Sequence, residues 1–281
     1  MKQQLRNISD TQKKSWDQFS PGWKKWELKL YDHMQPAADG IISLLKPKGS
    51  QLILDIAAGT GEPGLSIAKM LTDGKVIITD LSDEMLNIAR ENASKKGIAN
   101  VEFQACDVSE LPFPDQTFDA ASCRMGFMFF PDMPLAAKEI LRILKPGGKL
   151  ALTVWGPPEK NFWGTAIGDS IIRNLNLPRP APNSPGIFRC GKSGLMTDLL
   201  QQAGFINCTE SELICDLNCE TAEIYWQLMT EIAAPIVAGL NNADAAMKEK
   251  IKKDVCDLIN QKYPAGNIVI EGTALLIYGE K

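Results

Sequence analysis

The chain has 281 residues, of which 44% are hydrophobic and 23% charged, and its formal net charge is −4. This length favours one large domain with additional segments, and the charge does not indicate a surface for nucleic acid, so we expect no nucleic-acid partner. No apolar run approaches the roughly 18 to 20 residues of a membrane-spanning helix, and the first residues lack the apolar core of a signal peptide. We therefore expect a cytoplasmic protein without a membrane span.

Seven cysteines are irregularly spaced along the chain, and none forms a Cys-x-x-Cys pair, which is typical of reduced thiols. The only histidine, His33, is far in sequence from the nearest cysteine pair, Cys215 and Cys219. This spacing gives a zinc site little support. The sequence therefore predicts no metal.

From residue 51 to residue 155, short apolar runs alternate with helix-like segments, which is typical of a parallel sheet covered by helices on both faces. The predicted strands are 51–56, 75–80, 101–105, 118–123 and 149–155. Between the second and third strands, Ser82 is a predicted helix cap and Gly97 ends the helix. A further helix is predicted over 134–144.

After residue 155 the pattern changes to a proline-rich stretch over 157–192, which we expect to cross the surface as a loop. A helix over 193–203 and a strand over 205–213 follow. A strongly helical stretch from about 220 to 262 then precedes a last strand over 267–278. These segments bring the predicted number of strands to seven.

A glycine-rich turn, Gly59-Thr60-Gly61, follows the first strand directly after Asp55. Small residues at the carboxyl edge of a sheet let a ligand approach the backbone closely. With Gly64 the turn also matches the dinucleotide fingerprint, and Asp80 stands where an acid that binds a ribose is expected. An NAD-dependent oxidoreductase is therefore one alternative.

Three acids at successive strand ends favour S-adenosylmethionine (SAM) over NAD. Asp55 precedes the turn, where a carboxylate repels a pyrophosphate but attracts a cationic amino group such as that of SAM. Asp80 fits the ribose hydroxyls, and Asp107 can accept a hydrogen bond from the adenine amine while Val108 packs on the ring.

Each of these acids also has a purely structural interpretation. Asp80 could be a solvated turn residue, and Asp107 could form an Asx turn. Asp55 could cap the next helix, although we expect such a cap to lie nearer Pro63-Gly64, where that helix starts.

Four motifs occur in order over about a hundred residues, at 52–61, 78–82, 111–119 and 144–148. Together they resemble the class I SAM-dependent methyltransferases of ubiquinone and menaquinone biosynthesis, the UbiE-like family. The resemblance implies a Rossmann-like α/β fold whose seven-stranded, mostly parallel sheet has an antiparallel last strand. The family commonly has glycine at the position of Ala57, although its quinone-methylating branch tolerates alanine. Residues 122–132 resemble a bacterial subgroup without a single agreed substrate.

The predicted cofactor is SAM, with S-adenosylhomocysteine (SAH) as product. Arg124 follows the fourth strand and could meet the methionine carboxylate of SAM, a substrate carboxylate or a neighbouring acid. Cys106 is interpreted as a small apolar residue rather than a reactive thiol. The predicted cofactor-binding residues are Asp55, Ala57, Gly59, Thr60, Gly61, Asp80, Leu81, Met85, Cys106, Asp107, Val108 and Arg124.

All six tryptophans lie at or outside the ends of the core 51–154. Such rings suit segments that close over an apolar acceptor and a sulfonium cation, although they can also fix helices to a core. Trp26, in a leading helix with Trp23, is the preferred lid residue. The predicted substrate-binding residues are Trp23, Trp26, Tyr31, Met125, Phe127, Phe129, Trp163 and Phe188.

Methyl transfer by in-line displacement chiefly requires alignment and exclusion of water. A base is needed only if the acceptor is a phenol or hydroxyl, and His33 is the candidate, with Tyr31 and Tyr225 as weaker ones. A lone histidine is nevertheless more often structural.

The sequence thus predicts a SAM-dependent methyltransferase that acts on an apolar, aromatic or quinone-like small molecule. The acceptor atom (oxygen, carbon or nitrogen) and the choice between monomer and homodimer stay open. The alternatives are the oxidoreductase, a SAM-binding protein without turnover, and arsenite methylation, for which a cysteine beside the glycine turn is missing. The predicted units are a helical lid (1–48), a SAM-binding core (49–156), a proline-rich insertion over the substrate site (157–192), and the rest of the core with a helical insertion at about 219–262 (193–281).

Overall fold

The computed structural model describes residues 2–181 and 183–281; Met1 and Pro182, the latter in the predicted proline-rich insertion, lie outside the described residues. Within them the chain builds a seven-stranded sheet with the order β3-β2-β1-β4-β5-β9-β6. The strands are β1 (Leu52–Asp55), β2 (Lys75–Asp80), β3 (Val101–Ala105), β4 (Phe118–Arg124), β5 (Leu144–Trp155), β6 (Ile206–Ile214) and β9 (Thr273–Glu280).

Strands β1 to β5 pair in parallel, and β9 runs antiparallel to both β5 and β6. The predicted α/β fold with a mostly parallel sheet and an antiparallel last strand is therefore confirmed. The parallel strands place their carboxyl ends at one edge, which is where such sheets bind ligands.

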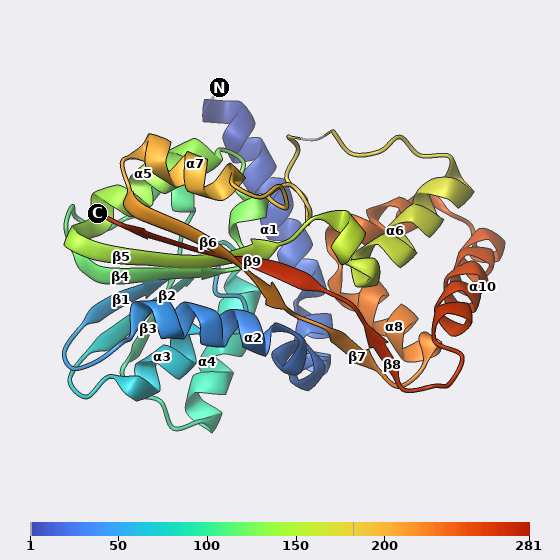
Figure 1. Cartoon of the computed structure of the whole chain (residues 1–281), viewed down its shortest axis with the longest axis horizontal. Coiled ribbons are helices and arrows are strands. Elements are labelled where there is room, and N and C mark those ends of the chain that lie inside the picture. Colours follow the sequence, from blue (N-terminus) through green and yellow to red (C-terminus); the bar gives the residue numbers. More distant parts are fainter. Residues whose placement is uncertain (1, 182) are drawn as a thin grey trace.

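Helices cover both faces of the sheet (Figure 1). One face carries α2 (Glu27–Leu45), α3 (Gly64–Met70) and α4 (Asp83–Lys95), and the other carries α5 (Met133–Ile143) and α7 (Leu195–Ala203). Along β1, Ile53 belongs to the apolar cluster on the first face and Leu54 to the cluster on the second. Burial on both faces explains the nearly continuous apolar runs of the strands.

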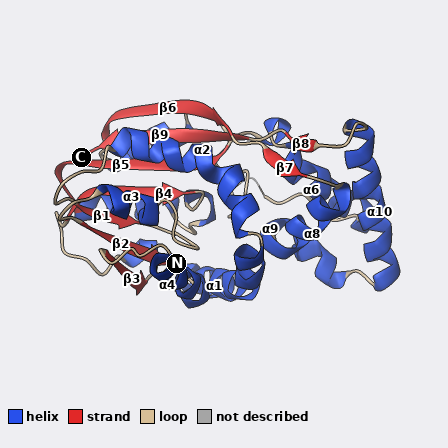
Figure 2. Ribbon diagram, turned by 90° about the horizontal axis from the view of Figure 1, so that it is seen from below, coloured by secondary structure: helices blue, strands red, loops and turns tan. Residues whose placement is uncertain are grey.

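A helical layer lies beside the carboxyl ends of the strands (Figures 1 and 2). It consists of α6 (Phe162–Leu175), α8 (Ala222–Ile232), α9 (Ala234–Val237), α10 (Ala245–Lys262) and the small sheet of β7 (Leu217–Cys219) and β8 (Ile268–Ile270). The N-terminal helix α1 (Lys2–Lys25) runs between this layer and the large sheet (Figure 1).

Three local expectations differ from the structure. The predicted loop over 157–192 contains α6, because 162–175 lacks proline and presents apolar residues such as Ile167 and Ile171 to the core. The single helical stretch over 220–262 is divided into α8, α9 and α10, with the short helix Ala238–Asn242 between α9 and α10. The predicted last strand is divided by Glu271-Gly272 into β8 and β9, which join different sheets.

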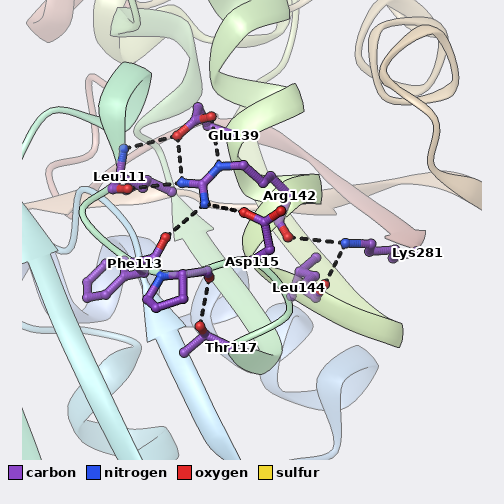
Figure 3. Close-up of polar contacts among 9 residues, drawn as sticks. Leu111, Phe113, Asp115, Thr117, Glu139, Arg142, Leu144 and Lys281 are labelled. Atoms are coloured by element: carbon purple, nitrogen blue, oxygen red, sulfur yellow. Dashed lines mark hydrogen bonds and ion pairs between the residues drawn. The ribbon is translucent and has the colours of Figure 1, made fainter.

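Arg142 on α5 holds the segment that follows β3 (Figure 3). Its guanidinium donates to the carbonyls of Leu111 and Phe113 at 3.0 and 2.8 Å, and to the carboxylates of Asp115 and Glu139. These carboxylates raise the pKa of Arg142 through their hydrogen bonds. The motif 111–119 is therefore fixed to α5 by one side chain, close behind the predicted adenine site.

Candidate active site

One cavity lies at the carboxyl edge of the sheet, enclosed by the ends of β1 to β5, α1, α2 and the helical layer. Nine of the predicted cofactor residues line it. They are Ala57, Thr60, Asp80, Leu81, Met85, Cys106, Asp107, Val108 and Arg124. The other three, Asp55, Gly59 and Gly61, are not among its lining residues. We call the part bordered by Asp80 and Asp107 the polar end of the cavity.

Asp55 is fully buried, and it caps α3, contrary to the expectation that a cap would lie nearer the helix. Its Oδ2 accepts a hydrogen bond of 2.7 Å from Gly64 N, and its Oδ1 accepts one of 2.7 Å from Ser122 Oγ. Desolvation by burial raises its pKa to about 7, although both hydrogen bonds oppose this rise. The glycine turn folds back and brings the start of α3 over the end of β1. Asp55 therefore reaches Gly64 although the two residues are well separated in sequence, which the expectation of a nearer cap did not take into account.

Asp80 joins the end of β2 to the glycine turn. Its two oxygens accept hydrogen bonds from Gly59 N at 2.8 Å and from Ser82 N at 2.9 Å, and burial raises its pKa. Since a carboxylate has about four acceptor positions, these two bonds leave capacity for ligand hydroxyls. The predicted cap also holds, because Ser82 Oγ accepts from Met85 N at the start of α4.

Asp107 combines the Asx turn with a contact to α1. Oδ1 accepts hydrogen bonds from the backbone and hydroxyl of Ser109, and Oδ2 accepts one of 2.6 Å from Ser9 Oγ. Oδ2 therefore keeps one acceptor position for a further donor. Asp107 therefore forms the Asx turn of the structural interpretation. This turn does not conflict with a ligand role, because Oδ2 can still accept a hydrogen bond from a ligand.

Two residues of the cavity wall have left-handed backbone although they are not glycine. Ala57 has φ 53° and Met125 has φ 57°. A side chain in this region costs about 1–2 kcal/mol, which explains why the resembling family commonly has glycine at the position of Ala57. The two turns touch: a Cβ added to Gly126 would lie 2.7 Å from Ala57 Cβ.

Arg124 enters the cavity from the end of β4. Its Nε donates to the carbonyl of Glu62 at 3.1 Å. Among the described residues, its terminal nitrogens make no hydrogen bond or ion pair. Burial lowers its pKa, and the nearby carboxylates of Glu62 and Asp55 oppose that effect. The guanidinium is thus anchored at one nitrogen and has donors left for a ligand.

Helix α1 contributes to the polar end, which was not predicted. Ser9, Gln12 and Trp16 line the cavity, Gln12 donates to the carbonyl of Phe129 at 2.7 Å, and Trp16 packs edge-to-face on the Phe129 ring at 5.2 Å. Their spacing of three and four residues places them on one helix face, a signal that the sequence already contained.

The opposite, apolar end is the part of the cavity lined by side chains of α2, β5, β7 and α8. The predicted substrate residues separate into two groups, according to whether they line the cavity. Trp23, Met125, Phe129 and Trp163 line the cavity, whereas Trp26, Tyr31, Phe127 and Phe188 do not. Trp26 is the preferred lid residue, but its ring nitrogen donates to Glu231 Oε2 at 2.8 Å.

The other three residues outside the lining have different surroundings. Tyr31 is exposed with Lys96 over its ring, Phe127 is buried against Phe130, and Phe188 packs behind Trp163. These four residues therefore support or flank the wall rather than form it.

Several residues of the apolar end were not singled out in the sequence. They are Leu30, Met34, Ile187, Leu217, Leu228, Met229, Ile232 and Ala233. They come from α2, β7, α8 with the residue after it, and the segment before α7, which are far apart in the chain. Only the fold brings them together, so no local pattern could have identified them.

His33 on α2 lies in the wall of the apolar end. Its ring stacks on Trp155 with centroids 4.9 Å apart and meets Trp163 edge-to-face at 5.5 Å. Burial lowers the pKa of His33 to about 4; the backbone of Asp216 and Cys215 opposes this effect, and the positive charge of Arg124 adds to it. The imidazole is therefore neutral at pH 7. Its Nδ1 is buried and has no hydrogen-bond partner among the described residues.

Three further observations concern the reactivity of Cys106, metal binding and membrane spans. Burial raises the pKa of Cys106 to about 12, which agrees with its interpretation as an unreactive thiol. In the described part of the chain, no group of three or more His, Cys, Asp or Glu is placed to hold a metal ion. No described helix is both long and apolar enough to cross a membrane.

Comparisons with known proteins agree with this geometry. A family model described as a methyltransferase domain matches residues 53–148. The demethylmenaquinone methyltransferase of Thermus thermophilus is 37% identical over 175 residues, which are 58% of this chain and 78% of that protein. The ubiquinone/menaquinone biosynthesis C-methyltransferase UbiE of Cellvibrio japonicus is 37% identical over 166 residues, 55% of this chain and 67% of that protein.

Among solved structures, the YcgJ protein of Bacillus subtilis superposes with a TM-score of 0.58 at 22% identity, covering 87% of this chain and 97% of that one. This similarity shows the fold, and the two sequence relatives show the family. The family decides against the nicotinamide oxidoreductase. The chain therefore belongs to the UbiE-like class I methyltransferases and is a SAM-dependent methyltransferase.

Proposed function

We propose that the polar end of the cavity binds SAM and that the apolar end binds an aromatic or quinone-like small molecule. The observation that carries this proposal is one cavity that is lined both by acids following β2 and β3 and by apolar side chains of α2, β5 and α8. The names of the two relatives, a demethylmenaquinone methyltransferase and a ubiquinone/menaquinone C-methyltransferase, support a quinone-like acceptor. Cytoplasmic location and the choice between monomer and homodimer stay predictions.

The side chains of the polar end suit SAM by charge and by hydrogen-bonding capacity. In the proposal, Asp80 accepts from the ribose hydroxyls, Asp107 accepts from the adenine amine, and Arg124 binds the methionine carboxylate. Asp55 acts on the cationic amino group through the backbone turn that it holds, because its own oxygens are engaged with Gly64 and Ser122. SAM supplies a methyl group activated by a sulfonium.

The apolar end supplies alignment and exclusion of water, the two requirements of an in-line displacement. Trp155, Trp163 and Trp23 give it rigid aromatic walls that also tolerate a neighbouring cation. A role for His33 as a base stays a prediction. Its lowered pKa makes the imidazole a weak proton acceptor at neutral pH, which does not favour that role.

Calorimetry with SAM, SAH and NAD tests the cofactor site. We expect SAM and SAH to bind and NAD not to bind. Asp107→Ala should weaken SAM binding about tenfold, since one charge-assisted hydrogen bond is lost. The matched control is Glu110→Ala, an exposed acid of the same loop that does not line the cavity, and it should leave SAM binding within about twofold. Equal losses in both variants would contradict the assignment of Asp107.

Turnover is tested separately by measuring SAH release with a panel of apolar phenols, quinols and amines. Methylation of at least one aromatic member supports the acceptor class. SAM binding with no SAH release across the panel would favour a SAM-binding protein without turnover.

A further inference from the structure

The guanidinium of Arg124 is held at one nitrogen only. Its Nε donates to the backbone carbonyl of Glu62 at 3.1 Å, whereas its two terminal nitrogens have no partner among the described residues. Arg124 lines the cavity, so these two nitrogens are the donors that it has left for a ligand there. A pair of parallel N–H donors of this kind fits the two oxygens of a carboxylate.

A carboxylate of the protein itself could occupy the same donors. The side chain of Glu62 is only 9% exposed. Burial lowers the pKa of Arg124, and the Glu62 carboxylate is the charge that opposes this effect most. In the described part of the chain, however, Glu62 and Arg124 form no ion pair, and the ion pair of Glu62 is with Lys96.

Both carboxylate oxygens of Glu62 are engaged with partners other than Arg124. Oε1 accepts from Lys96 Nζ at 2.7 Å, and Oε2 accepts from Ser66 N, in the first turn of α3, at 3.1 Å. Lys96 directly follows α4, and its ammonium lies 5.7 Å from the centroid of the Tyr31 ring. Glu62 therefore offers only its backbone carbonyl to the guanidinium.

The ammonium of Lys96 is what makes this arrangement favourable. Without it, the Glu62 carboxylate would be a buried charge with a single backbone donor, which is a costly state. Arg124 is a buried cation without a charged partner and would be available to that carboxylate. An ion pair between them would use the terminal nitrogens of Arg124 and withdraw them from a ligand.

We propose that Lys96 is a positioning residue: by holding the Glu62 carboxylate, it keeps the terminal nitrogens of Arg124 free for the carboxylate of the cofactor. This inference rests on the proposed function, because it takes SAM or SAH as the ligand of Arg124. Lys96 and Glu62 do not line the cavity, so both act through Arg124 and not on the ligand directly.

The test compares two ligands that differ only in the carboxylate. They are SAH and S-adenosyl-3-thiopropylamine, which is SAH with a hydrogen in place of its carboxylate. Their affinities for the whole protein are measured by calorimetry, and we call their ratio the carboxylate preference. In the wild type SAH should bind at least about tenfold more tightly, the size expected for charge-assisted hydrogen bonds to one carboxylate.

Substitutions of Lys96 should change this ratio specifically. In Lys96→Met the Glu62 carboxylate pairs with Arg124, so the carboxylate preference should fall to within about threefold, while the affinity for the decarboxylated analogue stays within about twofold. Lys96→Gln, a second neutral variant, should show the same loss. Lys96→Arg keeps a cation and should keep the preference.

The matched control is Lys95→Met, which removes the same charge from the neighbouring residue. The ammonium of Lys95 is 64% exposed and lies 3.9 Å from Glu91, so it does not hold Glu62. An exposed pair of this kind contributes little, and the variant should bind both ligands as the wild type does.

Glu62→Gln in the Lys96→Met protein distinguishes positioning from a purely structural role. A neutral amide does not form an ion pair with the guanidinium, so the carboxylate preference should return to within about twofold of the wild type. If the Lys96–Glu62 pair served stability alone, Lys96→Met would change the affinity for both ligands alike, and the second substitution would not restore the ratio.

The outcomes separate the two proposals. If SAH does not bind to the wild type, the proposed function fails and this inference fails with it. If SAH binds without a carboxylate preference, the cofactor assignment stands, but Arg124 does not bind the carboxylate and the inference is wrong. If Lys96→Met or Lys96→Gln binds the decarboxylated analogue and keeps the full preference, or if Lys95→Met loses it equally, the role of Lys96 is overturned.

Discussion

Asp55→Asn changes the charge of a buried carboxylate while preserving its size. In the wild type, the two oxygens of Asp55 accept from Gly64 N and Ser122 Oγ, both at 2.7 Å. The amide oxygen of asparagine can keep the bond from Gly64, and its NH₂ group can donate to the Ser122 hydroxyl. That hydroxyl already lies 3.5 Å from the carbonyl of Leu54, toward which it can turn. The cap of α3 should therefore survive the substitution.

The magnitude follows from the pKa of Asp55, which burial raises from 3.8 to about 7. Because the folded-state pKa lies above the unfolded one, the unfolded chain releases its proton first, and the free energy of unfolding falls as pH rises through this window. At about 1.4 kcal/mol for each pH unit of difference, ionised Asp55 destabilises the protein by about 4 kcal/mol above pH 7. Between pH 5 and pH 8 the change amounts to about 2.5 kcal/mol.

Urea unfolding of both proteins without cofactor, at intervals from pH 5 to pH 8, measures this effect. All other groups titrate alike in the two proteins, so the difference between their free energies of unfolding isolates Asp55. We expect Asp55→Asn to gain about 2.5 kcal/mol relative to the wild type over this range, with equal m-values. Profiles that run parallel within about 0.5 kcal/mol would show that Asp55 does not titrate here and would refute the reasoning from burial.

Three further substitutions test the packing around the site. Ala57→Gly removes a side chain from a left-handed residue and should raise the free energy of unfolding by about 0.5–1 kcal/mol, measured as a rise of about 2 °C in Tm; a lower Tm would contradict it. Arg142→Met should destabilise by about 2–3 kcal/mol in urea, whereas Asp115→Asn, at an exposed partner of Arg142, should lose less than about 1 kcal/mol, and equal losses would refute the central role of Arg142. Gly126→Ala forces a Cβ to 2.7 Å from Ala57 and should destabilise by about 2 kcal/mol, while the control Gly186→Ala, whose nearest neighbour would be 3.8 Å away, should be nearly neutral in the same assay.

The strands could be predicted from the sequence because their signal is local. β2 and β3 match their predicted bounds, since apolar runs that are buried on both faces need no knowledge of the rest of the chain. The rule that ligands bind at the carboxyl ends of parallel strands then placed Asp80 and Asp107 in one cavity. The geometry of turns was harder to predict from the sequence. The cap formed by Asp55 depends on how the glycine turn folds back over β1.

The wall of the apolar end depends on contacts that a single sequence does not reveal. Trp23 and Trp26 have the spacing of one helix face, but α1 ends at Lys25 and Trp26 becomes the residue before α2. The change of direction carries the Trp26 ring to Glu231, while Trp23 stays in the cavity wall. Helix periodicity predicts a shared face only as long as the helix continues. Pro21-Gly22, just before the break, is a local sign of it that the prediction did not use.

The charge of the lining side chains differs between the two ends of the cavity, and this difference explains which kind of ligand each end favours. Negative side chains at the polar end favour a cationic cofactor, and their hydrogen bonds to Gly59, Ser82 and Ser9 fix them before any ligand arrives. Oriented groups of this kind need little reorganisation when a ligand binds. The apolar end cannot stabilise charge by solvation, so it favours an acceptor that is neutral when it binds and excludes the water that would compete with it. Arg124, at the end of β4, is a cation of this cavity lining, and in the proposed arrangement the carboxylate of the cofactor pairs with it.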